Sequence, residues 1–113
     1  MPQPQIDFTA IAKQLETGLV QLASTSVKDY AKDATNDGMK MLDSLKTDLQ
    51  TWTVELANGD ITAKDLEYLV NAKNNLIQMD ALKQAGLAAI RIDQFKADAL
   101  NLITGTICKL IKV

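Results

Sequence analysis

The stretch ANGDI, residues 57–61, is the clearest stop signal in the sequence. Asn58-Gly59 is typical of a helix end, because both residue types adopt the left-handed backbone conformation at little steric cost. A new helix start follows at once, since Thr62 can cap a helix and Asp65, three residues on, completes a capping box. A connection this short makes the two flanking helices antiparallel neighbours. We therefore predict a helical hairpin whose corner lies at residues 57–61.

The half of the chain before this corner has the apolar spacing of an amphipathic helix. From Phe8 to Leu56, apolar residues recur at gaps of three and four. Two rows also recur every eleven residues: Phe8, Leu19, Tyr30, Met41 and Trp52, and then Ala12, Ala23, Ala34, Leu45 and Leu56. Eleven residues fill about three helical turns, and the rows keep their phase across Gly38. We therefore predict a continuous helix through Gly38.

The half after the corner has similar spacing, from Leu66 to Leu110. The predicted fold class is all-α, a long antiparallel hairpin of two helices of about 50 residues each. The alternative is a compact four-helix bundle that is bent near Gly38, which follows the turn-like residues 35–37, and near Gly86. Residues 1–5 hold both prolines and are predicted to form a flexible tail, so residues 6–113 form a single helical domain.

A register follows from the hairpin. If the corner is centred near residue 60, the numbers of facing residues add up to about 120. Gly18 should then face Leu102, so that a large side chain packs against a small one. Trp52 should face Tyr68 near the corner. Such interdigitation is how helices reach close packing.

Composition excludes several classes of protein. Of 113 residues, 47% are apolar and 23% charged, which is typical of a globular domain and not of a disordered chain. The 12 basic residues are interleaved with 14 acidic ones, so no basic stripe for nucleic acid is present. The N-terminus lacks the features of a cleavable signal peptide, and no apolar run reaches membrane-spanning length. We expect a cytoplasmic protein, or one that is exported without a cleavable signal peptide.

The residues for most enzymatic chemistry are missing. The sequence has no histidine, which removes the usual proton shuttle and the commonest metal ligand. One cysteine, Cys108, cannot form a zinc or iron–sulfur site and is interpreted as a small apolar packing residue. The carboxylates of Asp29, Asp33 and Asp37 lie one helical turn apart and are interpreted as a solvated helix face. We therefore predict no catalytic residue, no metal site and no cofactor, and a chain that is not an enzyme.

Doubled apolar pairs predict a surface for a partner. Adjacent residues lie about 100° apart around a helix, so one member of each pair must face away from the hairpin seam. Exposed, these positions would form an apolar patch of a size that monomers rarely show. The predicted interface consists of Val20, Val70, Ile77, Leu102, Ile103, Ile107, Leu110 and Ile111.

Two functions follow from that surface. The first is an interaction or assembly module that forms a homo-oligomer or packs on a helical protein partner. The alternative is an amphipathic, lipid-binding hairpin of the pore-forming kind, for which the partner is a membrane surface.

In outline, two antiparallel helices in about a hundred residues resemble the Trp-x-Gly family of small exported helical hairpins, and the subunits of secretion needles. The resemblance concerns architecture alone, and it implies a helical hairpin. The Trp-x-Gly turn motif itself is absent, because Trp52 lies seven residues before Gly59.

Overall fold

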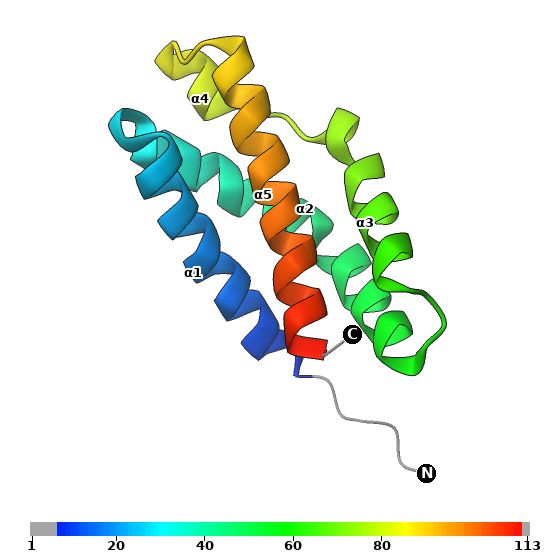
Figure 1. The fold of residues 1–113 in the computed structure, drawn as a ribbon. Helices are drawn as coiled ribbons and strands as arrows, with labels where there is room; N and C mark the ends of the chain where they lie inside the picture. The colour runs from blue at the N-terminus through cyan, green and yellow to red at the C-terminus, as the bar shows by residue number, and fades with distance from the viewer. Residues whose placement is uncertain (1–6, 112–113) are drawn as a thin grey trace.

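The computed structural model describes residues 7–111, and in that range the fold is all-helical (Figure 1). The predicted tail, residues 1–5, lies outside the described residues. The elements, in chain order, are α1 (Phe8–Ser26), the 3₁₀ turn η1 (Lys28–Tyr30), α2 (Ala31–Asn58), α3 (Ala63–Ala72), the 3₁₀ turn η2 (Asn74–Leu76), α4 (Asp80–Ala85) and α5 (Ala89–Ile111).

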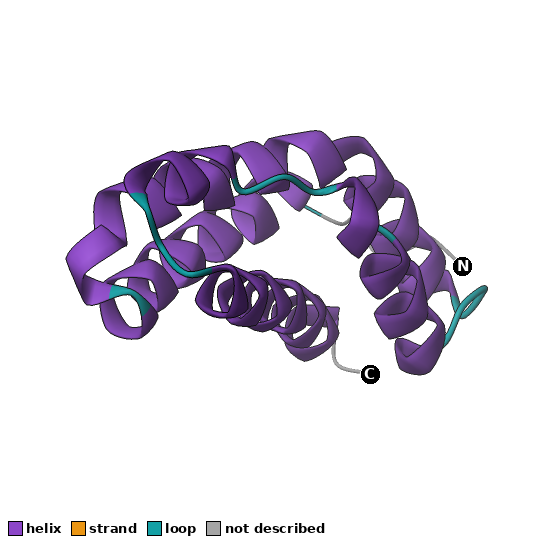
Figure 2. Cartoon of the chain, turned by 90° about the horizontal axis from the view of Figure 1, so that it is seen from above, coloured by secondary structure: helices purple, strands orange, loops and turns teal. Residues whose placement is uncertain are grey.

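The elements pack as four antiparallel passes, of which the third is made by α3, η2 and α4 (Figure 1). Helix α1 packs on both α2 and α5, while α3 also packs on α5. The start of α1 and the end of α5 therefore lie at one end of the molecule, and the α1–α2 turn, α4 and the start of α5 lie at the other. Figure 2 shows the short loops between the helices from above. The molecule measures 52 × 23 × 19 Å, whereas a helix of 50 residues alone would span about 75 Å.

The corner at residues 57–61 is confirmed. Gly59 ends α2 in the left-handed conformation, with φ +80° and ψ +10°. The Asp65 backbone N–H donates to the Thr62 hydroxyl oxygen at 3.1 Å, and the Thr62 N–H donates to the Asp65 carboxylate at 2.9 Å. These two bonds are the predicted capping box, and they satisfy N–H groups that would otherwise lack partners at the start of α3.

The two predicted helices of about 50 residues are not found. The longest run of joined helix covers residues 28–58, or 31 residues, because α1 ends at Ser26. There the Val27 backbone leaves the helical region, with φ −133° and ψ +59°, while its side chain stays buried in the core. The chain thus reverses at residues 27–30. No glycine or proline near Ser26 marks the end of α1. The helix ends there because the reversed chain buries the Val27 side chain.

The predicted continuity of the helix through Gly38 is confirmed, because Gly38 lies inside α2, and the bend that the alternative bundle placed there is not found. A Cβ atom on Gly38 would lie 3.8 Å from the Leu19 Cβ, so this glycine faces α1 where the two helices pack together. Gly86, in contrast, does end a helix: it closes α4 with φ +92°. A further break follows α3, where Ile77 is extended, with ψ +126°.

The core follows the apolar spacing even though the helices are shorter than predicted. Every member of the two eleven-residue rows is buried or half-buried. The predicted pair of Gly18 and Leu102 is confirmed, since a Cβ on Gly18 would lie 3.0 Å from a Leu102 methyl carbon. The pair of Trp52 and Tyr68 is wrong, because Tyr68 is 75% exposed.

Trp52 packs against α3 in another way. The Lys73 ammonium lies 6.0 Å from the centroid of the Trp52 ring and 3.1 Å from the carboxylate of Asp48. Both contacts are partly exposed, so each adds only a fraction of a kcal/mol, or about 1 kcal/mol at most. Lys73 ends the first segment of the third pass and fixes that end against α2.

Two glycine substitutions should have opposite effects on stability. Gly59→Ala should lower the free energy of unfolding by about 1 kcal/mol, because alanine is strained at positive φ. Gly105→Ala should raise it by about 0.5–1 kcal/mol, because Gly105 is inside α5 with open space around it. Urea denaturation of both variants measures this difference, and equal shifts would contradict the assigned backbone conformations.

Candidate interaction surface

The structure places the eight residues of the predicted interface in two groups. Four of them are buried in the core of the single chain: Val70, Ile77, Ile103 and Ile107. These four are not accessible to a partner in this structure. Val20 is 42% exposed, and the remaining three, Leu102, Leu110 and Ile111, are half-buried against the core.

The accessible members of this group do not form one continuous surface. Leu102 packs over Gly18, on the side of α1 that faces α5. Val20 follows Gly18 by two residues, which places it about 200° further around α1. Val20 and Leu102 are therefore on different sides of the bundle, and a single flat partner cannot cover both.

Two large apolar side chains outside the predicted interface are more exposed. Leu76 in η2 is 74% exposed, and Ile90 in the first turn of α5 is 79% exposed. The doubled pair Leu76-Ile77 was the available signal, but Ile77 is the buried member. The reason is the break after Lys73, which resets the helical phase and reverses the two roles.

Leu76 and Ile90 are sequence neighbours of residues that line a surface hollow. The hollow has a volume of about 300 Å³ and lies between the loop before α4, α4 itself and the start of α5. Five of its lining residues are apolar, three are charged and one is an amide: Ile77, Gln78, Met79, Asp80, Lys83, Leu87, Ala89, Ile92 and Asp93. A hollow of mixed lining, next in sequence to two exposed apolar side chains, has the apolar and polar mixture found at contacts between proteins.

A buried carboxylate holds one wall of this hollow in place. Asp37 of α2 accepts hydrogen bonds from the backbone N–H groups of Ala81, at 3.0 Å, and Leu82, at 2.8 Å. The local N-cap residue of α4, Met79, makes no side-chain cap bond, so Asp37 caps this helix from 44 residues away. The interpretation of Asp37 as part of a solvated face is wrong, because its side chain is fully buried.

A cation from α5 holds the preceding turn. The Lys96 ammonium donates to the backbone carbonyl oxygens of Asn74, at 3.1 Å, and Ile77, at 3.3 Å. These carbonyls lie at the two ends of the last turn of η2, and the Asn74 carbonyl also accepts from the Ile77 N–H at 3.2 Å. Asp37 and Lys96 therefore fix residues 74–85 between α2 and α5, and with them the exposed position of Leu76.

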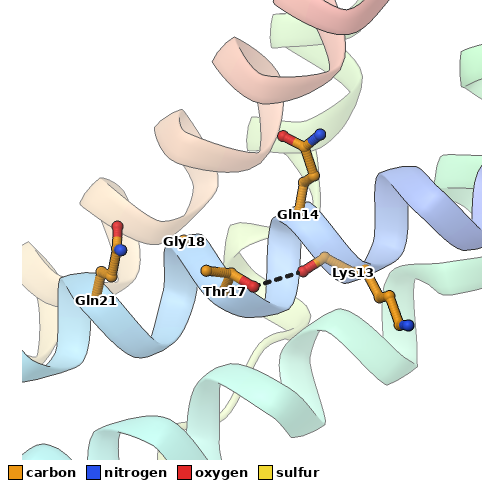
Figure 3. A pocket seen from close by; sticks show the side chains of 5 residues that line it. All are labelled: Lys13, Gln14, Thr17, Gly18 and Gln21. Carbon is orange, nitrogen blue, oxygen red and sulfur yellow. Dashed lines mark hydrogen bonds between the residues drawn. The ribbon is translucent and has the colours of Figure 1, made fainter.

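A second hollow is polar and lies along α1 (Figure 3). Its volume is about 360 Å³, and its lining residues are Lys13, Gln14, Thr17, Gly18 and Gln21. The Thr17 hydroxyl already donates to the Lys13 carbonyl oxygen at 3.0 Å, within the helix. One lysine and two amide side chains on an open helix face are available for hydrogen bonds but do not converge on one point.

The part of the chain that the structure describes contains no group of three potential metal-ligating side chains. None of the helices within residues 7–111 is both long enough and apolar enough to cross a bilayer. Comparisons with models of protein families, with curated proteins and with solved structures find no match for this chain.

Cys108 should react slowly with thiol reagents. Burial raises the pKa of the Cys108 thiol above its ordinary value of 9.0, and the negative charge of Glu67 raises it further. Because the thiolate is the reactive form, alkylation at pH 8 should be severalfold slower in the native protein than in urea. Equal rates in the two states would contradict this prediction.

The same raised pKa makes stability depend on pH. The folded state favours the protonated thiol. The contribution of Cys108 to the free energy of unfolding is therefore complete at pH values below the thiol pKa of the unfolded chain, and it is lost as the pH rises through the higher pKa of the folded state.

Glu67→Gln should lower the Cys108 pKa and speed alkylation, whereas Glu16→Gln, an exposed change in α1, should not.

Proposed function

We propose that this chain is a non-enzymatic helical interaction module that self-associates, with a second copy of the chain as its partner. The observations that best support the proposal are the exposed side chains of Leu76 and Ile90, and a hollow of mixed apolar and charged lining to which their sequence neighbours Ile77 and Ala89 contribute. Isolated exposed apolar residues are ordinary, but two whose sequence neighbours line the same hollow favour a docking surface.

The charges around the hollow suit a contact between two identical surfaces. Asp80, Lys83 and Asp93 line it, so it has both signs of charge. In a two-fold contact each residue meets the partner's copy of the same surface, and Lys83 of one copy can then face a carboxylate of the other. A surface of one sign would repel its own copy, and this surface does not.

The expected affinity is modest. Full burial of a leucine or isoleucine side chain contributes about 1.5–3 kcal/mol, and a two-fold contact buries two from each copy. The loss of translational and rotational freedom offsets about 4–15 kcal/mol of such gains. A contact confined to one end of a small bundle is also below the usual size of a tight interface. Only the most favourable ends of these ranges leave a net gain of about 8 kcal/mol, so we expect a dimer with a dissociation constant no tighter than about micromolar.

Light scattering over a concentration series tests the proposal. The mass should rise from 12.3 kDa towards twice that value, and the double variant Leu76→Glu/Ile90→Glu should stay at the monomer mass. Tyr68→Glu is the matched control, since Tyr68 is equally exposed but lies on α3. A constant 12.3 kDa up to millimolar concentration would contradict self-association. Flotation of that monomer with neutral or anionic vesicles would favour the lipid-binding alternative instead.

A further inference from the structure

We propose that α1 is an exchangeable arm. In this inference the turn at residues 27–30 straightens, α1 and α2 join into one helix, and α1 then packs in the equivalent place in a second copy. The inference rests on the proposed self-association and specifies how two copies combine. It also explains why a sequence with the spacing of one long helix forms a shorter one within a single copy.

The turn between α1 and α2 lacks the features that hold the other turns. Val27, which ends α1, and Tyr30, which precedes α2, make no side-chain cap bond for the elements that follow them, and neither is in the left-handed conformation. The α2–α3 turn, in contrast, has a left-handed Gly59 and a capping box, and the α4–α5 turn has a left-handed Gly86. Every residue from 26 to 31 can continue a helix, since none is glycine or proline.

The apolar positions keep a helical phase through the turn. Ala23, Val27, Tyr30 and Ala34 follow one another at gaps of four, three and four, and all are buried or half-buried. A straightened helix would therefore keep its apolar stripe on one side without a reset. It would cover residues 8–58 and span about 75 Å, which is the length of the helix predicted from sequence.

Exchange would preserve the packing of α1. This helix packs chiefly on α2 and α5. Its specific contacts, Gly18 over Leu102 and Leu19 against Gly38, involve these same two helices. In a two-fold dimer each α1 would pack on α2 and α5 of the other copy. The same packing would then form between the chains instead of within one chain. Only the turn and the newly joined surfaces differ, and short, weakly specified hinges favour such exchange.

The turn also lies at the end of the bundle that has the exposed apolar residues. Ser26 and Val27 line a small hollow of about 70 Å³ together with Arg91 and Phe95 of α5. Arg91 thus lies beside the turn, and Ile90, which precedes it in the first turn of α5, lies at the same end of the bundle. Straightening two turns brings these ends of two copies together, which places both Ile90 side chains at the new contact.

Cross-linking within the α1–α5 contact distinguishes exchange from simple docking. The test uses the full chain with Cys108→Ser, Gly18→Cys and Leu102→Cys, oxidised mildly at low and at millimolar concentration. Exchange predicts that the disulfide joins two chains in the dimer, so that non-reducing gels show a covalent dimer. A non-covalent dimer whose disulfides stay within each chain would overturn exchange and leave self-association standing. A protein that is monomeric at every concentration would overturn both.

Hinge variants without added cysteines give a second test. Asp29→Ala should raise the association constant of the dimer about tenfold, since alanine favours the straight helix in both copies. Asp43→Ala is the matched control. Asp43 is an exposed residue of α2 in the single copy and would be helical in both forms, so its substitution should leave the association constant unchanged. Lys28→Pro should lower the constant by more than about a hundredfold, because proline breaks a helix interior.

Lys28→Pro should leave the single-copy fold intact. Lys28 is the first residue of η1, and Val27 before it already lies outside the helical region that a following proline disfavours. Circular dichroism and urea denaturation at low concentration check this. Unchanged dimerisation of both hinge variants would overturn exchange, whatever the cross-linked variant does.

Discussion

Asp37→Ala should lower the free energy of unfolding by about 3 kcal/mol and detach α4 from the bundle. The change removes the carboxylate that accepts two hydrogen bonds, which the N–H groups of Ala81 and Leu82 donate, and leaves both donors short of a partner. Hydrogen bonds to charged groups contribute about 1.5–3 kcal/mol each, and stranded buried donors add to the loss. Urea denaturation gives the free energy, and hydrogen exchange at Ala81 and Leu82 reports the release of α4.

The effect must be specific to this buried carboxylate. Asp43→Ala, an exposed change in the same helix, should alter the free energy of unfolding by no more than about 0.5 kcal/mol. Asp37→Asn keeps the shape and one acceptor oxygen, so it should fall between the two. A loss below about 1 kcal/mol for Asp37→Ala, with normal exchange protection of α4, would show that Asp37 does not hold this helix.

Phe95→Ala should lower the free energy of unfolding by about 4 kcal/mol. Phe95 is the largest of the fully buried side chains and adjoins the small hollow beneath the α1–α2 turn. Its removal would enlarge that hollow, and truncation of buried phenylalanine typically costs about 3–5 kcal/mol. Thermal and urea denaturation at low concentration measure the loss in the single chain.

Tyr68→Ala provides the aromatic control for Phe95→Ala. Tyr68 is 75% exposed on α3, so its truncation should change the free energy of unfolding by about 0.5 kcal/mol or less. Similar losses for the two aromatic residues would contradict the burial of Phe95 in the core.

The sequence predicted those features of the fold that have a local cause. Gly59 supplies the left-handed conformation, and Thr62 with Asp65 supplies the cap, all within a few residues. The two eleven-residue rows likewise consist of residues that are buried or half-buried, and the hairpin register predicted that Gly18 packs against Leu102. These features depend on residue type and helical periodicity, which a single sequence contains.

The break at Val27 could not be predicted in this way. The residues around it suit a helix, and the chain reverses there because packing of α1 on α2 and α5 outweighs the local preference for helix. Sequence periodicity cannot distinguish a straight helix from two that pack together in the same phase. Under the exchange hypothesis, these two arrangements are both accessible to this chain.

The polar contacts that shape the candidate surface were hidden for a related reason. Asp37 has neighbouring carboxylates one turn away, so its sequence context resembles an exposed face. Its partners lie 44 and 45 residues further on, and only tertiary packing brings them together. The poor cap at Met79 was the available local sign that α4 needs an acceptor from elsewhere.

Small-angle X-ray scattering over a concentration series tests the central claim, a compact bundle that associates with a second copy. At low concentration the radius of gyration should be close to the 14.4 Å of the structure, and at high concentration the forward scattering should show a doubled mass. A monomer with a radius near 22 Å, expected for a rod of about 75 Å, would contradict the fold. A mass that stays at 12.3 kDa throughout would contradict the proposed function.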